Sequence, residues 1–326
     1  MDRSIRHGGT AGQSLPAAGL PGAYAAASGL RDGRRLDLQR NITVALLEVA
    51  QWLPWLDDAR RLLDSDEAAR VRRRRFPAHR DALAIAYAVH RLVLGQALGQ
   101  EPAQVPLTRD DLGCPRLPGD VAFTSLSHAD GVVALAVTRS GPVGIDIELR
   151  SRAAVMLELA GSVCHPRDAA DISGLDVCAR GAAMLALWVR KEALLKAAGV
   201  GLAVPMASFA APEHPALWLP VLFAGPVRVQ MLAAGPSCVV AVAGATGSEV
   251  ECRWLRPVSG SSARSMPARA METTSTATRA HPLGAGPAGR DGWQAAFVGN
   301  AGMPVPGLSN MDGLPVCRSR SGGASQ

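Results

Sequence analysis

Two long helical patterns organise the chain, and the first follows an apolar run and a charged segment. Residues 42–50 are apolar and begin with β-branched side chains, which predicts an opening strand. Ser65 and the two acidic residues after it predict the N-cap of a helix that continues through a run of arginines and ends before Pro77. Residues 79–98 carry an apolar stripe at helical spacing that stops at Gly99, so we expect a long helix there.

Short apolar runs separated by turn residues predict strands on both sides of a second long helix. Asp130-Gly131 lies between two such runs, which is typical of a β-hairpin. The second long helix is expected over about 180–198, with Gly199 at its end. The strands are expected at 121–126, 132–138 and 143–149 and again at 227–232, 238–242 and 252–255, with shorter helices near 153–160 and from 166.

The order of these elements predicts an α+β fold of two similar subdomains in one chain. Each half, about 42–142 and 143–256, holds one long helix and a few strands. We therefore expect a pseudo-twofold arrangement in which each helix packs on a small antiparallel sheet, with a site at the seam between the halves. Gly, Pro and Ser make 27 of the last 70 residues. Because such segments bury too little apolar surface to offset the entropy of ordering, we expect 1–41 and 257–326 to be disordered.

The formal net charge of +6 belongs to the two ends of the chain. Residues 1–40 and 257–326 each carry six Arg and three acidic residues, whereas 41–256 carries 22 basic and 22 acidic residues. The neutral middle disfavours a nucleic-acid or membrane-surface binder, and no apolar run is long enough to predict a transmembrane helix. The six cysteines lack C-x-x-C spacing, so we expect a reduced, cytoplasmic protein without structural zinc.

Two carboxylates share one face of the strand expected at 143–149. Side chains alternate along a strand, so Ile145 and Ile147 should face the core while Asp146 and Glu148 project together from the other face. Paired carboxylates repel each other unless a cation or hydrogen-bond donors lie between them, and oxygen ligands suit Mg²⁺. The alternative is an amphipathic strand with a solvated acidic face.

The two lysines of the chain lie within six residues of each other in the second long helix, whereas the other 32 basic residues are all Arg. Glu192 and Lys196 are four residues apart and share a helix face, with Lys191 beside them. An ammonium group is a good partner for phosphate. The alternative is a surface Glu–Lys pair that contributes little to stability.

Two further segments carry candidate polar residues. Ser127-His128 lies where a strand leads into a turn, and the alternative to a binding role is an ordinary turn residue. Residues 70–75 hold five Arg and form a basic patch, which is either a solvated helix face or a site for phosphate or nucleic acid. Few aromatic residues interleave this run, which disfavours single-stranded nucleic acid.

Together the charged segments resemble one known family. Gly144-Ile-Asp-Ile-Glu148, followed about forty residues later by Trp188-x-x-Lys-Glu-Ala-x-x-Lys196, resembles the paired signatures of the surfactin-type (Sfp-like) 4′-phosphopantetheinyl transferase superfamily. Ser127-His128 and Gly113-x-Pro115 precede the first signature in the family's order. The resemblance covers about 42–243.

The resemblance implies an enzyme that moves the 4′-phosphopantetheine arm of coenzyme A to a serine of an apo acyl or peptidyl carrier protein, with Mg²⁺ as cofactor and release of 3′,5′-ADP. The implied partners are carrier proteins and coenzyme A, without nucleic acid or membrane, and we expect a monomer. The implied metal ligands are Asp146, Glu148 and Glu192, and the implied catalytic residues are Glu192, Lys196 and Asp146. The implied coenzyme A contacts are Arg72, Arg73, Arg75, Ser127, His128, Lys191 and Lys196.

The resemblance leaves the proton acceptor open. Glu192 is the first candidate because it would lie at the metal, and Asp168 or a metal-bound water are the others. The chain departs from the family at Cys114 and Val200, where cationic residues are common, and the arginine run is a candidate to compensate. These departures keep a second hypothesis in view, a non-catalytic relative that binds carrier proteins.

Overall fold

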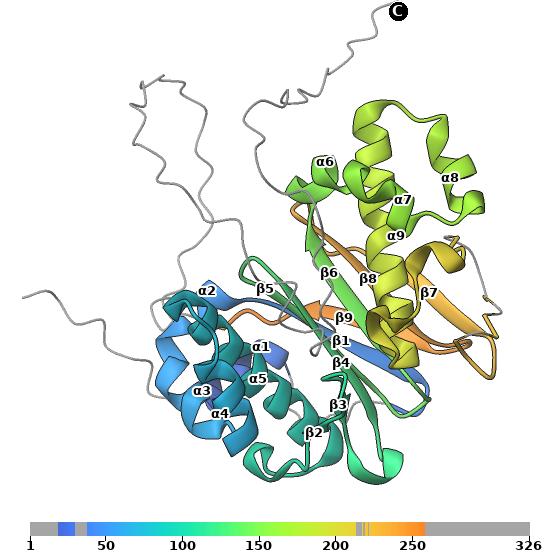
Figure 1. The fold of residues 1–326 in the computed structure, drawn as a ribbon. Coiled ribbons are helices and arrows are strands. Elements are labelled where there is room, and N and C mark those ends of the chain that lie inside the picture. Colours follow the sequence, from blue (N-terminus) through green and yellow to red (C-terminus); the bar gives the residue numbers. More distant parts are fainter. Residues whose placement is uncertain (1–18, 30–37, 213–216, 218, 221, 258–326) are drawn as a thin grey trace, which may run out of the picture.

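Figure 1 shows the fold in a computed structural model, which describes residues 19–29, 38–212, 217, 219–220 and 222–257. Most of the chain that was expected to be disordered, namely 1–18, 30–37 and 258–326, lies outside the described residues. Within them the mixed α and β composition expected from the sequence is confirmed. A pseudo-twofold relation between the halves stays a prediction.

The first sheet combines strands from both ends of the described chain. Its strands are β1 (Asn41–Glu48), β4 (Phe123–Ala129), β5 (Val132–Thr138) and β9 (Glu249–Trp254), in the order β4-β5-β1-β9. The pairs β4–β5 and β5–β1 are antiparallel, but β9 runs parallel to β1. The chain reaches β9 only after crossing the whole second half, which is the long crossover that a parallel pair needs. The antiparallel sheet predicted for the first half is therefore corrected to a mixed sheet.

The second sheet is antiparallel, as predicted. It consists of β6 (Gly144–Leu149), β8 (Cys238–Ala245) and β7 (Val227–Leu232), in the order β6-β8-β7. A small hairpin of β2 (Thr108–Arg109) and β3 (Pro115–Arg116) lies apart from both sheets in the hydrogen-bond pattern. Asp130 and Gly131 both have positive φ in the β4–β5 turn, which confirms the hairpin signal in the sequence.

Two long helices cover the two sheets. These are α5 (Pro77–Leu98) in the first half and α9 (Val177–Ala198) in the second, and each ends at a glycine in the left-handed conformation, Gly99 and Gly199. Shorter helices fill the connections, as Figure 1 shows. They are α2 (Val49–Trp52), α3 (Leu56–Leu62), α4 (Ser65–Arg72), α6 (Ala153–Met156), α7 (Ala160–Val163) and α8 (Pro166–Ser173).

The start of α4 and the position of Pro77 differ from the sequence prediction. The N-cap of α4 is Asp64 rather than Ser65, because the Asp64 side chain accepts a hydrogen bond from the Glu67 backbone N–H while the Glu67 carboxylate accepts one from the Asp64 N–H. Helix α4 ends at Arg72, and Pro77 is the first residue of α5 rather than the end of the preceding helix. The fixed φ of proline suits a first helical position, where the N–H has no partner to lose.

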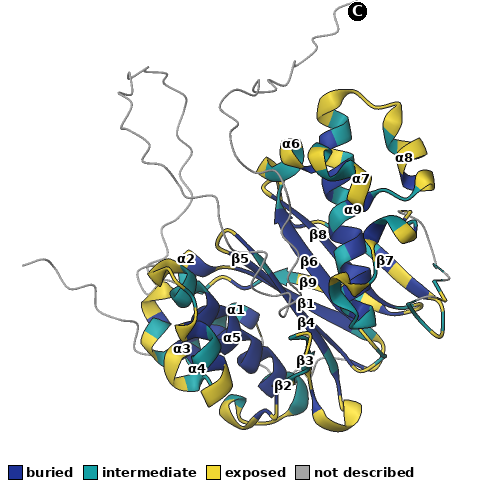
Figure 2. Ribbon diagram, in the orientation of Figure 1, coloured by how far each residue is buried: buried dark blue, intermediate teal, exposed yellow. Residues whose placement is uncertain are grey.

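Three apolar clusters define the layers of the molecule. The first lies between α5 and the first sheet, and the second lies between α9 and the second sheet. The third lies between the sheets and contains Ile42, Val44, Ala134, Ile145 and Val240. Figure 2 shows that β1, β4, β5, β6 and β8 and the inner faces of α5 and α9 are largely buried, while the short helices α3, α4, α6 and α8 are mostly exposed or half-buried. Ile145 is thus buried in the core, as predicted, and it lies in the cluster between the sheets, so Asp146 projects toward α9.

A helix outside the predicted domain packs on the first half. α1 (Leu20–Ser28) buries Leu20 and Tyr24, and the Tyr24 hydroxyl donates a hydrogen bond to Gln96 Oε1 of α5 at 2.5 Å. The prediction of disorder for 1–41 is therefore wrong for this segment, because its few large apolar side chains find a surface on α5. No helix among the described residues is long and apolar enough to cross a membrane.

Candidate functional site

Gly144 allows α9 to lie close to β6. A Cβ atom at Gly144 would come within 2.0 Å of the Ala193 carbonyl oxygen and 2.4 Å of the Ala197 backbone nitrogen, so only glycine permits this approach. The helix residues around this contact include Glu192 and Lys196, and the strand residues after Gly144 include Asp146. The first glycine of the strand signature thus brings both charged segments into one place.

Three polar side chains meet where β4 and β6, the edge strands of the two sheets, lie beside each other; we call this place the seam. Lys196 Nζ lies 2.6 Å from Asp146 Oδ1 and 2.9 Å from Ser127 Oγ. The Ser127 hydroxyl donates a hydrogen bond to the same Asp146 oxygen at 2.7 Å. Residues from three elements, β4, β6 and α9, therefore form one hydrogen-bonded triangle.

Two more carboxylates complete the acidic cluster of Asp146, Glu148 and Glu192. Glu148 is buried, with Arg152 Nη1 3.6 Å from its Oε2 atom. The pKa of Glu192 is raised to about 7, mainly by burial and in addition by the negative charges of Asp146 and Glu148, while Lys196 opposes the rise. Burial also lowers the pKa of Lys196, but the three carboxylates more than offset that effect, so its pKa is raised. The structure therefore brings all three predicted metal ligands within electrostatic reach of Lys196.

The donor set of the acidic cluster fits a hard cation. Asp146 Oδ2 is buried and accepts no hydrogen bond from any described residue, which leaves one ligand oxygen available. Within the described part of the chain, no three His, Cys, Asp or Glu side chains are already arranged around a common point for an ion. Mg²⁺ does not need such a cage, because it commonly takes one or two carboxylates and completes its shell with water and substrate phosphate.

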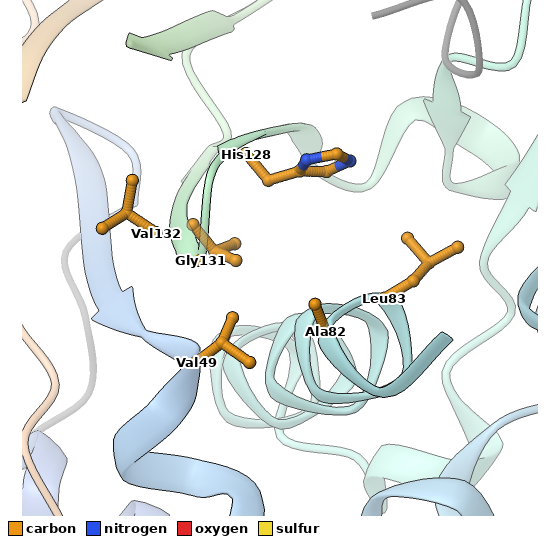
Figure 3. A pocket seen from close by; sticks show the side chains of 7 residues that line it. Val49, Ala82, Leu83, His128, Gly131 and Val132 are labelled. Atoms are coloured by element: carbon orange, nitrogen blue, oxygen red, sulfur yellow. The ribbon is translucent and has the colours of Figure 1, made fainter. Parts of the chain in front are cut away.

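His128 lines a small apolar pocket beside the seam (Figure 3). Its ring stands on β4 opposite Leu83 and Ala82 of α5, with Val49 on another side of the pocket. The pKa of His128 is lowered to about 4, mainly by burial and in addition by the positive charges of Lys196, Arg74 and His79. At neutral pH the imidazole is therefore uncharged and offers one N–H donor rather than a full charge.

The arginine run contributes a different residue from those predicted. Arg72, Arg73 and Arg75 are exposed, whereas Arg74 is half-buried. The charge of Arg74 also lowers the pKa of His128. The pKa of His79 is lowered mainly by desolvation and to a smaller extent by Arg74. Arg74 and His79 could not be predicted from the sequence, because the chain leaves the helix after Arg72 and the helical spacing that assigns faces is lost before Pro77.

Other cations surround Cys114, where the family commonly has Lys or Arg. Burial and Asp110 raise the pKa of the Cys114 thiol, while Arg116, Arg109 and Lys196 act on it in the opposite direction. Arg116 Nε donates to Asp110 Oδ2 at 2.9 Å. The guanidinium group of Arg116 also lies close to Gly199, since a Cβ atom on Gly199 would come within 2.4 Å of Arg116 Nη2. Positive charge is thus present beside Cys114 although residue 114 itself carries none.

Lys191 does not reach the seam. Its side chain is completely buried, and its ammonium group donates to the carbonyl oxygens of Val163, Met206 and Phe209 at 2.7–2.9 Å. Asp168 Oδ2 lies 2.6 Å from the same nitrogen. A role for Lys191 in binding pyrophosphate is not compatible with this position, because every donor direction is occupied inside the second core.

Asp168 is likewise a structural residue. Its second oxygen accepts a hydrogen bond from the Ala211 backbone N–H at 3.1 Å, and its Oδ2 also accepts one from the His165 backbone N–H. The carboxylate is 5% exposed and paired with Lys191, so it cannot receive a proton from a substrate. Of the two residues considered as proton acceptor, Glu192 alone lies at the acidic cluster.

Val200, the second position at which the chain departs from the family, packs against the second core.

Comparisons with known proteins identify relatives of this chain. The family model of the 4′-phosphopantetheinyl transferase superfamily matches residues 142–224, which contain the acidic cluster and Lys196. The chain is 32% identical over 174 residues to the 4′-phosphopantetheinyl transferase HetI of Nostoc sp., which covers 50% of this chain and 73% of the relative. It is 30% identical over 121 residues to a 4′-phosphopantetheinyl transferase of Bacillus subtilis, covering 36% and 52% of the two chains. The chain belongs to the 4′-phosphopantetheinyl transferase superfamily.

Proposed function

We propose that this chain is an active transferase that moves 4′-phosphopantetheine from coenzyme A to a serine hydroxyl of an apo carrier protein and releases 3′,5′-ADP. The observation that carries the proposal is the acidic cluster with Lys196 against it at the seam. A pyrophosphate ester needs positive charge around it. Carboxylates can supply this charge by holding a cation, and an ammonium group beside them adds to it. The names of the relatives from Nostoc and Bacillus subtilis support the same reaction.

Asp146, Glu148 and Glu192 would hold Mg²⁺. When bound, the ion would neutralise charge on the pyrophosphate and on the departing 3′,5′-ADP. Lys196 supplies a second positive charge at the same place, and its donors point at Asp146 and Ser127 in this structure. With coenzyme A present, we expect the Lys196 ammonium group to donate to a pyrophosphate oxygen as well, because it has three donors.

The proton of the carrier serine needs an acceptor. As the serine oxygen bonds to the phosphorus nearest the pantetheine arm, the bond from that phosphorus to the bridging oxygen breaks and 3′,5′-ADP leaves with the electron pair. We assign the proton to the Glu192 carboxylate. Glu192 is the candidate acceptor that lies at the acidic cluster, where the serine oxygen and the phosphorus would meet, whereas Asp168 is buried against Lys191.

Two further groups of polar and cationic side chains would bind the rest of the anionic substrate. One group is His128 with Arg74, and the other is Arg116 and Arg109 near Cys114. Lys196 acts electrostatically on both His128 and Cys114, so the two groups share Lys196 as a neighbour. This distribution supports coenzyme A binding in spite of the uncharged residue at position 114.

The test is the mass of an apo carrier protein after incubation with the full chain, coenzyme A and Mg²⁺. We expect the carrier to gain one phosphopantetheine group, and we expect Asp146→Ala to abolish the gain while the variant still melts cooperatively. Arg152→Gln, which removes a 3.6 Å contact to Glu148 but none of the three carboxylates, is the control and should retain activity. An unchanged mass across acyl and peptidyl carriers would instead favour a non-catalytic relative that binds carriers.

Three finer expectations depend on this proposal. We expect the protein to act in the cytoplasm, where coenzyme A and carrier proteins occur together. We expect it to be a monomer. The carriers would belong to fatty-acid, polyketide or non-ribosomal peptide synthesis, including secondary metabolism.

A further inference from the structure

Ser127 has its hydrogen-bonding directions fixed by its neighbours. An ionised carboxylate can only accept and an ammonium group can only donate, so the Ser127 hydroxyl must donate to Asp146 Oδ1 and accept from Lys196 Nζ. The serine is 6% exposed. Its one hydrogen is therefore used inside the protein and is not available for a phosphate oxygen, which differs from the nucleotide contact expected from the family resemblance.

The two oxygens of Asp146 are consequently in different states. Oδ1 accepts hydrogen bonds from both Ser127 and Lys196, whereas Oδ2 is buried and accepts none from the described residues. A charged donor from Lys196 and a neutral donor from Ser127 meet the same oxygen, and together they fix the rotation of the carboxylate group. The rotation that satisfies Oδ1 leaves Oδ2 on the side of the carboxylate away from both donors.

We infer that Ser127 is a positioning residue that orients Asp146 so that Oδ2 is the oxygen offered to the divalent ion. The inference rests on the proposed function for the presence of that ion. Partners that hold a ligand side chain commonly change metal affinity 10- to 100-fold when they are removed. Ser127 would therefore act on metal binding through Asp146, without touching the metal or coenzyme A.

Ser125 offers a matched control on the same strand. It lies two residues before Ser127 and faces the same neighbouring strand, where its Oγ accepts a hydrogen bond from the Ile145 backbone N–H at 3.1 Å. It is 4% exposed, so both serines are equally buried in the seam. Loss of the Ser125 hydroxyl would disturb the contact between the sheets, but it would leave both oxygens of Asp146 as they are.

The experiment measures Mg²⁺ binding to the full chain by calorimetry with saturating coenzyme A and no carrier. We expect Ser127→Ala to weaken Mg²⁺ binding by about 10- to 100-fold, and Ser125→Ala to change it less than about threefold. Ser127→Thr keeps the hydroxyl and should restore most of the affinity. Thermal melting of each variant shows whether it folds, and the threonine variant keeps the comparison valid if the alanine variant melts early.

A second arm measures coenzyme A binding in EDTA. If Ser127 positions Asp146, Ser127→Ala should change the affinity for coenzyme A little without metal. An equal loss of coenzyme A affinity in EDTA and in Mg²⁺ would identify Ser127 as a phosphate contact and overturn the inference. Equal weakening of Mg²⁺ binding by Ser125→Ala and Ser127→Ala would overturn it too, because the effect would then come from the seam as a whole.

The carrier assay separates this inference from the proposed function. If the wild-type chain modifies a carrier but Ser127→Ala binds Mg²⁺ normally, the positioning role is wrong and the transferase activity stands. If Mg²⁺ binding responds to the variants as expected but no carrier is modified, the positioning role stands and the proposed reaction is wrong.

Discussion

Lys196 Nζ and Asp146 Oδ1 lie 2.6 Å apart, and this contact ties the last turns of α9 to the middle of β6. Asp146 is buried and Lys196 only partly exposed, so removing the ammonium group would leave the acidic cluster without its counter-charge. We therefore expect Lys196→Met to destabilise the metal-free protein by about 3 kcal/mol in urea unfolding.

Addition of Mg²⁺ should recover much of the stability lost in Lys196→Met, because the ion supplies positive charge at the same carboxylates. Arg152→Gln, which loses a 3.6 Å contact to Glu148 from a side chain that is one-third exposed, is the control and should cost less than about 1 kcal/mol. Equal stabilities of the two variants in EDTA would contradict an electrostatic role for the Lys196–Asp146 contact.

The raised pKa of Glu192 predicts a pH-dependent stability in the absence of metal. Burial and the neighbouring carboxylates raise this pKa from 4.5 to about 7, so the folded protein holds the Glu192 proton more tightly than the unfolded chain does. The resulting stabilisation is complete below about pH 4.5 and is lost as the pH rises through 7. Urea unfolding in EDTA should therefore show wild type losing stability relative to Glu192→Gln across this range.

Since other groups titrate in the same window, the difference between wild type and Glu192→Gln is the quantity to follow. Near pH 8, Mg²⁺ should reverse the sign of this difference and make wild type the more stable of the two, because the ion prefers the ionised carboxylate. A difference that stays constant from pH 4.5 to 8 would show that Glu192 has an ordinary pKa.

Lys191→Met tests the assignment of Lys191 to the core. The variant leaves Asp168 and three carbonyl oxygens without their common donor, so we expect a loss of about 3–5 kcal/mol in the free energy of unfolding. The affinity of the remaining folded protein for coenzyme A should be unchanged in calorimetry below its melting temperature. A variant with wild-type stability and weakened coenzyme A binding would return Lys191 to the binding site.

Arg74 and Arg72 form a matched pair within the arginine run. Arg74 is half-buried and acts electrostatically on His128, whereas Arg72 is exposed. We expect Arg74→Ala to raise the KM for coenzyme A about tenfold, the effect of one lost charge-assisted hydrogen bond, and Arg72→Ala to raise it less than about twofold. Steady-state kinetics with a saturating carrier would measure both, and an equal or reversed order would show that the exposed arginines bind the substrate.

Local patterns predicted most of the elements but not how the sheets combine. The strands at 132–138 and 227–232 and the glycine ends of both long helices could be predicted because alternation and helix stop signals are local. The pairing of β9 with β1 could not, since it joins residues about 200 positions apart and leaves no periodic signal. The packing of α1 was missed because a short apolar segment gains its stability only from the surface it meets.

The sequence by itself determined which residues carry charge on the faces of β6 and α9, because side-chain direction follows from the periods of strand and helix. Asp146, Glu148, Glu192 and Lys196 were identified in this way. Only the tertiary structure decided that Lys196 faces the acidic cluster while Lys191, five residues earlier and about 140° round the same helix, faces the core. It also decided that Ser127 contacts a carboxylate, because hydrogen bonds between distant strands depend on packing that no local pattern encodes.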